Sequence, residues 1–503
     1  MAPTESHAQS ERLAEERAEQ ARWRPRKPAG EMAAFERLIE GEFLASERQE
    51  AAGAARLRGT VDFAAANVPY YRDLFAALKL SPADIAGPED LPRIPELNKA
   101  VIQNEGKRML ATRLPAGEEI IGTHTSSGST GKPTAVYLTQ SAGFMRLLLT
   151  QRQLRWYRFD PMLTFAWIRM GKDMRVPPNG RPLADGETLR ELSWPGLGHF
   201  FETGPFLGYA KSNPTERKVR WLEEHRPDYL LAATTVLEHL AFAFQDRPKL
   251  PGLRALRAVS EPLPPGMRAR IEGTFGVPVH ISFGLDEIGW VATRCTEGGR
   301  YHVHTEHCLV EIVDESGAPC RPGEFGRMLI TTLSNPAMPL IRYVTDDVAQ
   351  ALGGPCPCGR TLPVFGDVIG RYSQMANLPA ETLALANALR GAMERLAPPL
   401  SRAVREYQVR HDAAGDFELR VKCVGALAHG FREHVTEIWR RALAARETKA
   451  APDPALSIRE VESIALAPSG KFFHFVSEFA GPSAGQSPET VAEETASHLE
   501  PFE

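Results

Sequence analysis

Apolar residues recur along the chain at spacings that predict both helices and strands. Four of them follow helical spacing near the N-terminus: Phe35, Leu38, Ile39 and Phe43. This spacing predicts one amphipathic helix over residues 31–57. Between residues 110 and 340, short β-rich runs alternate with helical stretches such as 215–225, a pattern typical of an α/β domain with layered helices. Residues 301–333 instead predict antiparallel strands, a β-rich addition to that domain.

The pattern changes near residues 370–371, after a segment rich in cysteine and proline. Residues 417–423 alternate as one face of a strand and residues 431–439 follow helical spacing, which together predict a small α+β unit. The polar, acidic end of the chain has too few apolar residues to bury a core. We therefore predict four parts: a disordered lead-in (1–30), a large α/β domain (31–370), a small mobile α+β domain (371–480) and a disordered tail (481–503).

Composition excludes several classes of protein. The chain has 503 residues, of which 43% are hydrophobic and 24% charged, so it is neither disordered nor fibrous. Its 59 basic and 63 acidic side chains give no general attraction to nucleic acid. The most apolar stretch, Tyr229–Phe244, is shorter than the roughly 20 residues that span a bilayer, so no transmembrane helix is expected. The N-terminus has no secretory signal and the 6 cysteines are too sparse for a disulfide scaffold, which predicts a cytoplasmic protein.

One segment has the composition of a phosphate-binding loop. Its residues are Thr125, Ser126, Ser127, Gly128, Ser129, Thr130, Gly131 and Lys132. Hydroxyls, flexible backbone N–H groups and a lysine can together surround phosphate oxygens. The loop is not of the Walker type, because Ser126 stands where that motif needs glycine and Pro133 follows the lysine. A flexible Ser/Gly linker is the alternative, but a linker needs neither the lysine nor the apolar run that follows.

This loop resembles the phosphate-loop signature of adenylate-forming enzymes, the superfamily of acyl-CoA synthetases, adenylation domains and luciferases. Further segments resemble its motifs in the expected order: an adenine motif (Ser282, Phe283, Gly284, Leu285, Asp286, Glu287), a ribose motif (340–347), a hinge (Gly370-Arg371) and a C-terminal lysine motif (468–471). The chain is particularly similar to the phenylacetate-CoA ligase family, in residues 68–72, 91–99 and the Cys-x-Cys-Gly-Arg element at 356–360.

The resemblance implies an ATP- and Mg²⁺-dependent ligase that activates a carboxylic acid as acyl-AMP. Lys132 and the loop donors would hold the β- and γ-phosphates, Glu287 would ligate Mg²⁺, and Lys471 would reach the charge that develops in the reaction. The implied nucleotide contacts are Asp347 with ribose, Phe283 with adenine, and Glu261, after Ser260, with the adenine amino group. Ser282, Gly284, Asp286 and Arg371 complete the predicted nucleotide-binding residues.

The chain departs from the superfamily pattern at several positions. Asp286 replaces a hydroxyl residue, Phe283 a tyrosine and Asp346 a glycine, and the loop after Arg371 is altered. The acyl acceptor is therefore open among coenzyme A, a carrier protein and an amine-type nucleophile, as in ligases of secondary metabolism. Two rival functions are a non-catalytic nucleotide-binding scaffold of the same fold and a phosphoryl transferase, although no kinase signature is visible.

Two further features are predicted from residue type. Cys295, His302, Cys356 and Cys358 could supply four tetrahedral ligands to a structural Zn²⁺, an arrangement that related ligases can carry, with His304 or Cys308 as substitutes for the histidine. The alternative is four unligated side chains. An aryl or small hydrophobic acid is the expected substrate, with pocket or core aromatic residues at Trp156, Trp167, Trp194, Phe200 and Phe201. The apolar stripe of the first helix would be buried internally or in a homodimer.

Overall fold

The computed structural model of the chain describes residues 5–126, 134–177, 179–245, 247–371, 380–396, 399–401, 403–446, 453–464 and 474–478. The chain divides into two compact units. The first contains residues 1–372 and 465–472, and the second contains residues 373–464 and 473–503. Each unit is described by itself.

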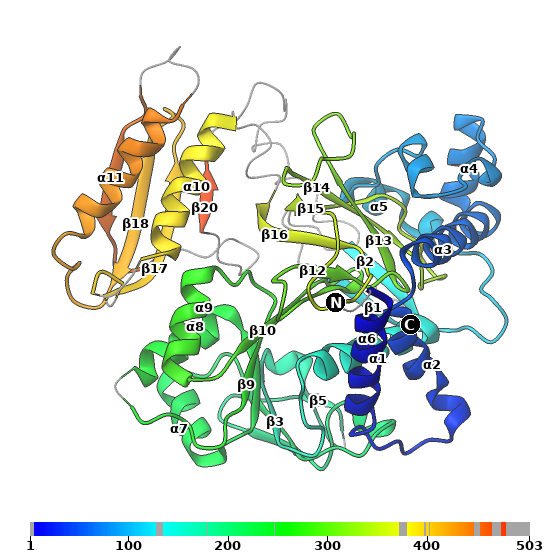
Figure 1. Cartoon of the computed structure of the whole chain (residues 1–503), viewed down its shortest axis with the longest axis horizontal. Helices are drawn as coiled ribbons and strands as arrows, with labels where there is room; N and C mark the ends of the chain where they lie inside the picture. The colour runs from blue at the N-terminus through cyan, green and yellow to red at the C-terminus, as the bar shows by residue number, and fades with distance from the viewer. Residues whose placement is uncertain are drawn as a thin grey trace, which may run out of the picture. The chain divides into compact units, whose positions relative to one another are not determined.

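A 12-stranded sheet runs through the large unit (Figure 1). One end of it is a set of neighbouring parallel strands: β10 (Val279–Leu285), β9 (Ala255–Val259), β8 (Tyr229–Ala233), β3 (Phe165–Arg169) and β7 (Phe206–Ala210). The short strand β6 (Thr188–Glu191) closes this end in the antiparallel sense. Parallel strands connected through helices produce the α/β architecture, so the predicted fold class is confirmed.

The parallel strands are buried on both faces. Leu230 and Leu256 belong to the same core cluster as residues of α7 (Thr215–His225), α8 (Thr234–Phe244) and α9 (Pro265–Phe275). Their strand neighbours Leu231 and Ala255 pack instead with residues of α6 (Gln140–Trp156). Because successive side chains alternate between the faces of a strand, these strands must be apolar along their whole length. This explains the β-rich runs in the sequence.

The other end of the sheet is antiparallel. It continues from β10 through β11 (Gly289–Arg294), β12 (Tyr301–Val303), β16 (Val364–Arg371), β15 (Tyr343–Ala351), β14 (Phe325–Thr332) and β13 (Cys308–Val313). These strands confirm the predicted β-rich addition. A separate hairpin pairs β1 (Ile120–Ser126) with β2 (Thr134–Thr139), and a second pairs β4 (Arg175–Val176) with β5 (Arg181–Pro182). Residues 127–133, which contain residues 127–132 of the predicted phosphate loop, come between β1 and β2 in the sequence and lie outside the described residues.

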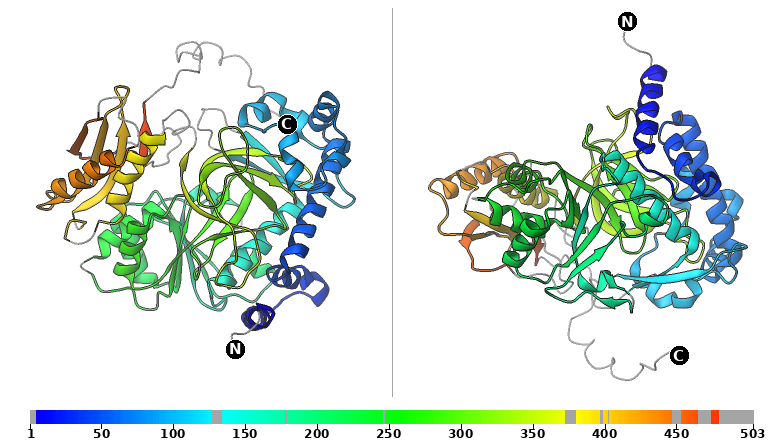
Figure 2. Two further views of the ribbon diagram at one scale, coloured as in Figure 1. Left: turned by 45° about the horizontal axis from the view of Figure 1, so that its top comes forward. Right: turned by 90° about the horizontal axis from the view of Figure 1, so that it is seen from below.

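The N-terminal segment differs from the expectation of a disordered lead-in. Residues 5–20 form helix α1 (Glu5–Gln20), and Trp23 is buried against the rings of Trp194 and Phe201. A β-bridge joins Pro25 to Phe201. The expectation of disorder is therefore wrong for residues 5–25, where α1 is the dark-blue helix near the N-terminus in Figure 2. The ring contacts of Trp23 anchor the segment that follows it.

Two helices replace the one predicted over residues 31–57. They are α2 (Ala29–Gly41) and α3 (Ser46–Asn67), followed by α4 (Pro69–Leu78) and α5 (Lys99–Glu105). The break contains Glu42, whose side chain is fully buried and accepts hydrogen bonds from Arg155, Trp156 and Arg360. Apolar spacing predicts one helix through this position. The helix is instead interrupted where the carboxylate of Glu42 pairs with side chains of α6.

Glu42 belongs to a buried network of six charges. Its members are Glu16, Glu42, Glu306, Arg152, Arg155 and Arg360. The three carboxylates balance the three guanidinium groups, so this network carries no net charge. Burial alone would raise the pKa of Glu42, but Arg155, Arg152 and Arg360 hold that pKa below its usual value. The network joins α1, the α2–α3 break, α6 and the Cys-x-Cys-Gly-Arg element.

The second unit has a four-stranded sheet with two helices. The strand order is β19 (Leu456–Glu460), β18 (Phe417–Cys423), β17 (Val404–His411) and β20 (Phe475–Ser477). The helices are α10 (Ala380–Glu394) and α11 (Phe431–Ala444), and both the strand over 417–423 and the helix from residue 431 agree with their predicted spacing. Among the helices described in either unit, none is long and apolar enough to cross a bilayer.

The buried network gives the first testable prediction. Glu42→Gln should lower the free energy of unfolding at pH 7 by about 3–5 kcal/mol, because it leaves buried guanidinium groups without a counter-charge. Since the native pKa of Glu42 is depressed, its contribution is present above its unfolded pKa and is lost as pH falls through the native value, so the difference from wild type should shrink in acid. Urea denaturation at both pH values measures this.

The matched control for this experiment is Glu40→Gln. Glu40 pairs with Arg17 at the surface, where its side chain is 58% exposed, so its loss should cost no more than about 1 kcal/mol. Equal costs for the two variants would contradict the role given to the network.

Candidate active site

The carboxyl ends of the parallel strands bring the residues of the predicted adenine motif to one edge of the sheet. Ser260 and Glu261 follow β9, Phe283 and Gly284 lie near the end of β10, and Thr234 follows β8. The three ends are adjacent because the three strands are parallel neighbours. Such an edge is where open α/β sheets bind their ligands, since helix N-termini and loop polar groups converge there.

Glu261 is held firmly at this edge. Its Oε2 accepts a hydrogen bond from the backbone N–H of Thr235 at 2.8 Å, in the first turn of α8, and its Oε1 lies 3.4 Å from Lys211 Nζ, just after β7. Ser260 before it has a φ of 69°, a left-handed conformation that is unfavourable for a residue with a Cβ. Both carboxylate oxygens of Glu261 therefore have partners within the protein. Contact of Glu261 with an adenine amino group stays a prediction.

Glu287 is the most buried acid of the motif, with 6% of its surface exposed. Lys99 Nζ lies 3.1 Å from its carboxylate, and the hydroxyl of Tyr343 donates a hydrogen bond to the same oxygen at 3.1 Å. Burial alone would raise the pKa of Glu287, but Lys99 and Tyr343 hold it below its usual value. Glu287 is therefore ionised at neutral pH, as a ligand of a hard divalent cation must be.

Lys99 is a candidate functional residue that the sequence analysis did not assign. It begins helix α5, whose N-terminus is capped by Asn98 through a 3.0 Å bond to the N–H of Val101. The cap fixes the direction in which the first turn presents its side chains. The available signal was a lysine directly after a capping asparagine, inside a segment that resembles the phenylacetate-CoA ligases.

Asp286 has a neighbouring cation that the sequence did not predict. The guanidinium of Arg146, on α6, donates to the backbone oxygen of Asp286 at 3.2 Å and lies 3.1 Å from His124 Nε2. Burial and Arg146 together lower the pKa of His124, so its imidazole is neutral. Gly289, at φ 103°, leaves room for Arg146, because a Cβ there would lie 3.0 Å from its Nε. The second acid of the motif thus has a positive group beside it to offset its charge.

The ribose motif over residues 340–347 runs into β15, which begins at Tyr343. Asp346 has a φ of 68°, in the region that favours glycine, and aspartate is one of the few other residues that adopt it. The next residue, Asp347, is opposite Arg371 in the register of β15 and β16, so these two predicted residues are brought together. Phe283 is half-buried and packs edge-on against Phe365 at 5.9 Å between ring centres. The departures at Asp346 and Phe283 therefore fit the local backbone.

Several predicted residues cannot be placed. Lys471 and residues 127–132, which include Lys132, lie outside the described residues. The backbones of Thr125 and Ser126 belong to β1, opposite Ala135 and Thr134 of β2. The tail over residues 481–503 also lies outside the described part.

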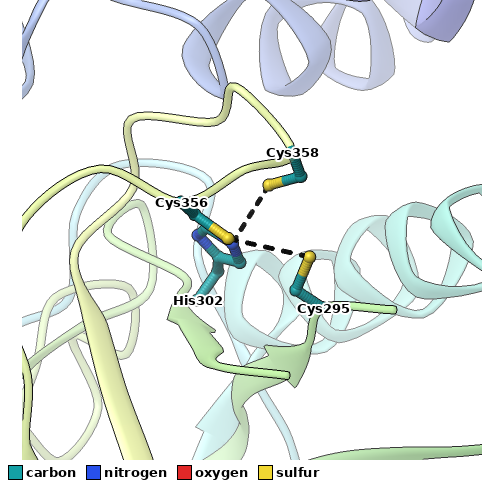
Figure 3. Close-up of side chains that lie close together, drawn as sticks. All are labelled: Cys295, His302, Cys356 and Cys358. Carbon is teal, nitrogen blue, oxygen red and sulfur yellow. Dashed lines mark hydrogen bonds between the residues drawn. The ribbon is translucent and has the colours of Figure 1, made fainter. Parts of the chain in front are cut away.

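The four predicted zinc ligands lie together, with their side chains pointing toward one another (Figure 3). Cys295, His302, Cys356 and Cys358 are all buried, and their ligand atoms lie within 4.8 Å of one another. Cys358 Sγ is 3.3 Å from His302 Nε2, whereas the ring of His302 faces the carbonyl of Leu362 with Nδ1 at 3.4 Å. A proton on Nδ1 would leave Nε2 free to bind a metal.

The two substitutes considered for His302 have other partners. His304 lies between Arg152 and Thr293, at 3.2 and 3.0 Å, and the thiol of Cys308 faces the carbonyl of Val291. Neither belongs to the cluster. Among the described residues, the geometry therefore selects His302.

Comparison with known proteins adds independent information. The family profile described as AMP-binding enzyme matches residues 197–335. Phenylacetate-coenzyme A ligase from Thermus thermophilus is 29% identical over 341 residues, 66% of this chain and 73% of that protein. The same enzyme from Escherichia coli K12 is 28% identical over 333 residues, 64% of this chain and 70% of that protein.

A solved structure has the same fold. It is 2-hydroxyisobutyryl-CoA ligase with its acyl-AMP, which superposes with a TM-score of 0.66 at 18% identity and covers 87% of this chain and 91% of that one. The chain has the fold of the adenylate-forming acyl-CoA ligases. Its sequence is similar to those of the phenylacetate-CoA ligases. The AMP-binding match contains Ser260, Glu261 and Glu287.

The pairing of Glu287 with Lys99 gives the second prediction. Lys99→Met should lower the free energy of unfolding by about 1–3 kcal/mol at pH 7, because Glu287 is then buried without its counter-charge and its pKa rises. The loss should shrink as pH falls, because the uncompensated carboxylate then takes up a proton. Thermal unfolding across pH measures both effects.

Lys172→Met is the control for this prediction. Lys172 is exposed, and a surface lysine without a strong partner contributes within about 0.5 kcal/mol. If Lys99→Met were as stable as this control at every pH, the pairing would have no energetic role.

Proposed function

We propose that the protein is an ATP-dependent acid–CoA ligase, which forms an acyl-adenylate and then an acyl thioester. The observation that carries this proposal is Glu287, an ionised and buried carboxylate beside Lys99, at the sheet edge where the adenine motif gathers. The match to the AMP-binding enzyme family and the shared fold support the first half-reaction. The names of the curated relatives, all phenylacetate-CoA ligases, support coenzyme A as the acceptor.

In the first half-reaction, a carboxylate oxygen of the acid would attack the α-phosphorus of ATP. The bond from that phosphorus to the bridging oxygen breaks, and pyrophosphate leaves with the electron pair. Both reactants are anions, so positive groups must offset their repulsion. Lys132 and residues 125–131 would bind the β- and γ-phosphates, and Lys471 would contact the developing charge.

The remaining residues would bind the nucleotide and its cation. The ionised Glu287 fits a Mg²⁺ ligand, and Mg²⁺ would supply neutralising charge to the phosphates. Lys99, whose Nζ lies 3.1 Å from the carboxylate of Glu287, would supply a second positive charge to phosphate oxygens bound beside that residue. Asp347 would accept hydrogen bonds from the ribose hydroxyls, and Phe283 would lie against the adenine.

In the second half-reaction, the thiol of coenzyme A would attack the acyl carbon and release AMP. The C-terminal domain over residues 371–480 would move between the two half-reactions, as a conformational step that exchanges one set of contacts for another. The acceptor in this step distinguishes a CoA ligase from a ligase of carrier proteins or amines. Only the products of the reaction separate these possibilities.

The third prediction tests the proposed chemistry. With an aryl acid, the protein should catalyse acid-dependent exchange of pyrophosphate into ATP, and with coenzyme A it should release AMP while consuming the thiol. Lys471→Ala should lower exchange by about 10²–10³, the usual effect of removing one group that stabilises developing charge, while nucleotide binding is largely retained. Radiolabel exchange and calorimetric titration with ATP measure the two quantities.

Three outcomes would contradict the proposal. Nucleotide binding by folded wild-type protein with no exchange for any acid would indicate a non-catalytic scaffold. Release of ADP instead of AMP would indicate a phosphoryl transferase. Acyl transfer to a carrier protein or an amine, but not to coenzyme A, would keep adenylation and replace the acceptor.

We also propose that Cys295, His302, Cys356 and Cys358 bind a structural Zn²⁺. Three thiolates and one imidazole match the donor set of closed tetrahedral zinc sites, and the buried cluster leaves no side open to a substrate. Arg360, in the same element, reaches Glu16 and Glu42, so the ion would also hold a part of the charge network in place.

The fourth prediction concerns this ion. Purified protein should contain about one zinc per chain, and removal by a chelator should lower the unfolding temperature, because metal binding contributes to the stability of the native state. Cys356→Ser should reduce the zinc content, whereas Cys320→Ser, outside the cluster, should not. Elemental analysis with no stoichiometric metal would contradict the site.

A further inference from the structure

Arg257 is a buried cation without a counter-ion in the described part of the chain. It lies on β9 with 1% of its surface exposed, and among the described residues it has no ion pair. Its polar protein contact is with the side-chain oxygen of Gln153, and its guanidinium stacks over the ring of Trp290 at 4.8 Å. Neither partner carries a negative charge. Burial lowers the pKa of Arg257 to about 10, which still leaves it protonated at neutral pH.

The described residues that neighbour Arg257 on the adjacent strands carry no negative charge to offset its own. The neighbouring position on β10 is His280, whose ring stacks on Tyr157 and whose pKa is lowered to about 3 by burial and by Arg268 and Arg257. This imidazole is neutral. Arg169, at the end of β3, is a second cation that acts on Arg257. By contrast, Arg152 and Arg155 of α6, which are also deeply buried, both have carboxylate partners.

Hydrogen-bond donors near Arg257 are also unpaired. Its Nε and the side-chain nitrogen of Gln153 are buried and have no partner among the described residues. The same is true of the indole nitrogen of Trp167, which points from the same face of the sheet, since Trp167, Leu231 and Arg257 are in register on parallel neighbours. Buried donors without acceptors are rare in native proteins and each costs about 1–3 kcal/mol. Two of these donors belong to Arg257 and its partner Gln153, and the third lies two strands away on the same face of the sheet.

This group is connected to the candidate active site. Trp290 is opposite Gly284 of the adenine motif in the register of β10 and β11, and a Cβ at Gly284 would lie 3.0 Å from its ring. The same ring lies under the guanidinium of Arg257. Its indole N–H donates to Thr150 at 3.0 Å on α6. Arg146, Thr150 and Gln153 follow one face of that helix, and Arg146 is the residue that contacts Asp286. One face of α6 and the ring of Trp290 thus connect the adenine motif with Arg257.

We infer that Arg257, Gln153 and Trp167 form the distal end of the acid-binding site and select acids that carry a second anionic oxygen group. The inference rests on the proposed function. An acid lying along Trp290 would present its reacting carboxylate near Asp286 and Glu287 and its far end to Arg257. A second carboxylate there would neutralise the cation and accept from the unpaired donors. A small hydrophobic acid, which the aromatic residues of the sequence led us to expect, would leave the charge of Arg257 without a counter-ion and the donors without acceptors.

The fifth prediction uses a graded set of acids: benzoate, phenylacetate and 3-phenylpropionate, each with hydrogen, methyl, hydroxyl or carboxylate in the para position. At the chain length that fits, the para-carboxylate acid should have a kcat/KM for pyrophosphate exchange about 100-fold above its para-methyl counterpart, because a site built on polar groups rejects an analogue that leaves them unpaired. The hydroxyl acids separate hydrogen bonding from charge.

Arg257→Met should abolish this preference, so that the ratio of the two kcat/KM values falls to about 1 or below. The variant should fold with an unfolding temperature equal to or above that of wild type, because it removes an uncompensated buried charge. Arg257→Lys should restore part of the preference. The control is Arg254→Met on the same segment, whose side chain is 60% exposed beside Asp228 and which should keep the wild-type ratio.

The outcomes separate this inference from the proposed function. Exchange with unsubstituted or methyl acids, but no advantage for the carboxylate, would overturn the anionic subsite and leave the ligase intact. A preference for hydroxyl over carboxylate acids would overturn the anionic assignment. A carboxylate preference unchanged by Arg257→Met would also overturn it. Exchange with none of the acids would reject the ligase itself.

Discussion

The parallel register of β3, β7, β8, β9 and β10 is the constraint on which the candidate site depends. These strands are covered on both faces, so their interior positions are mostly apolar and polar groups accumulate at their carboxyl ends. That edge therefore gathers Thr234, Glu261 and Glu287 from distant parts of the sequence. Arg257 is the exception to the rule, a charge placed inside a strand that the rule would make apolar.

Charge compensation is the second theme of the large unit. The three buried acids of the network meet three arginines, Glu287 meets Lys99, and Asp286 lies beside Arg146. Such pairing is required because an isolated ion in the interior costs more than the fold can sustain. Arg257 departs from this rule, because it has no partner of opposite sign among the residues that the structure describes. Positions that break a rule observed elsewhere in the same protein are where function is expected, because the missing partner can be a ligand.

The N-terminal segment and the cysteine element are parts of the same structure. Glu16 of α1 pairs with Arg155 and with Arg360, which directly follows the Cys-x-Cys-Gly sequence. The ring of Trp156 stacks under Arg360 at 4.1 Å, next to His302. A segment outside the family resemblance thus packs onto an element inside it. The same arginine that balances Glu42 connects the buried charges of α6 with the four candidate metal ligands.

The sequence by itself determined the features that are local. Motif order, the alternation of strands and helices, and the identity of Cys295, His302, Cys356 and Cys358 could be predicted because each depends on neighbouring residues or on residue type. Only the tertiary structure decided which charges meet. The contacts that matter join positions more than 100 residues apart: Glu42 with Arg155, Lys99 with Glu287, and Arg257 with the uncharged Gln153. No local spacing encodes such contacts. A buried charge is recognised by what surrounds it, and its surroundings exist only once the chain has folded.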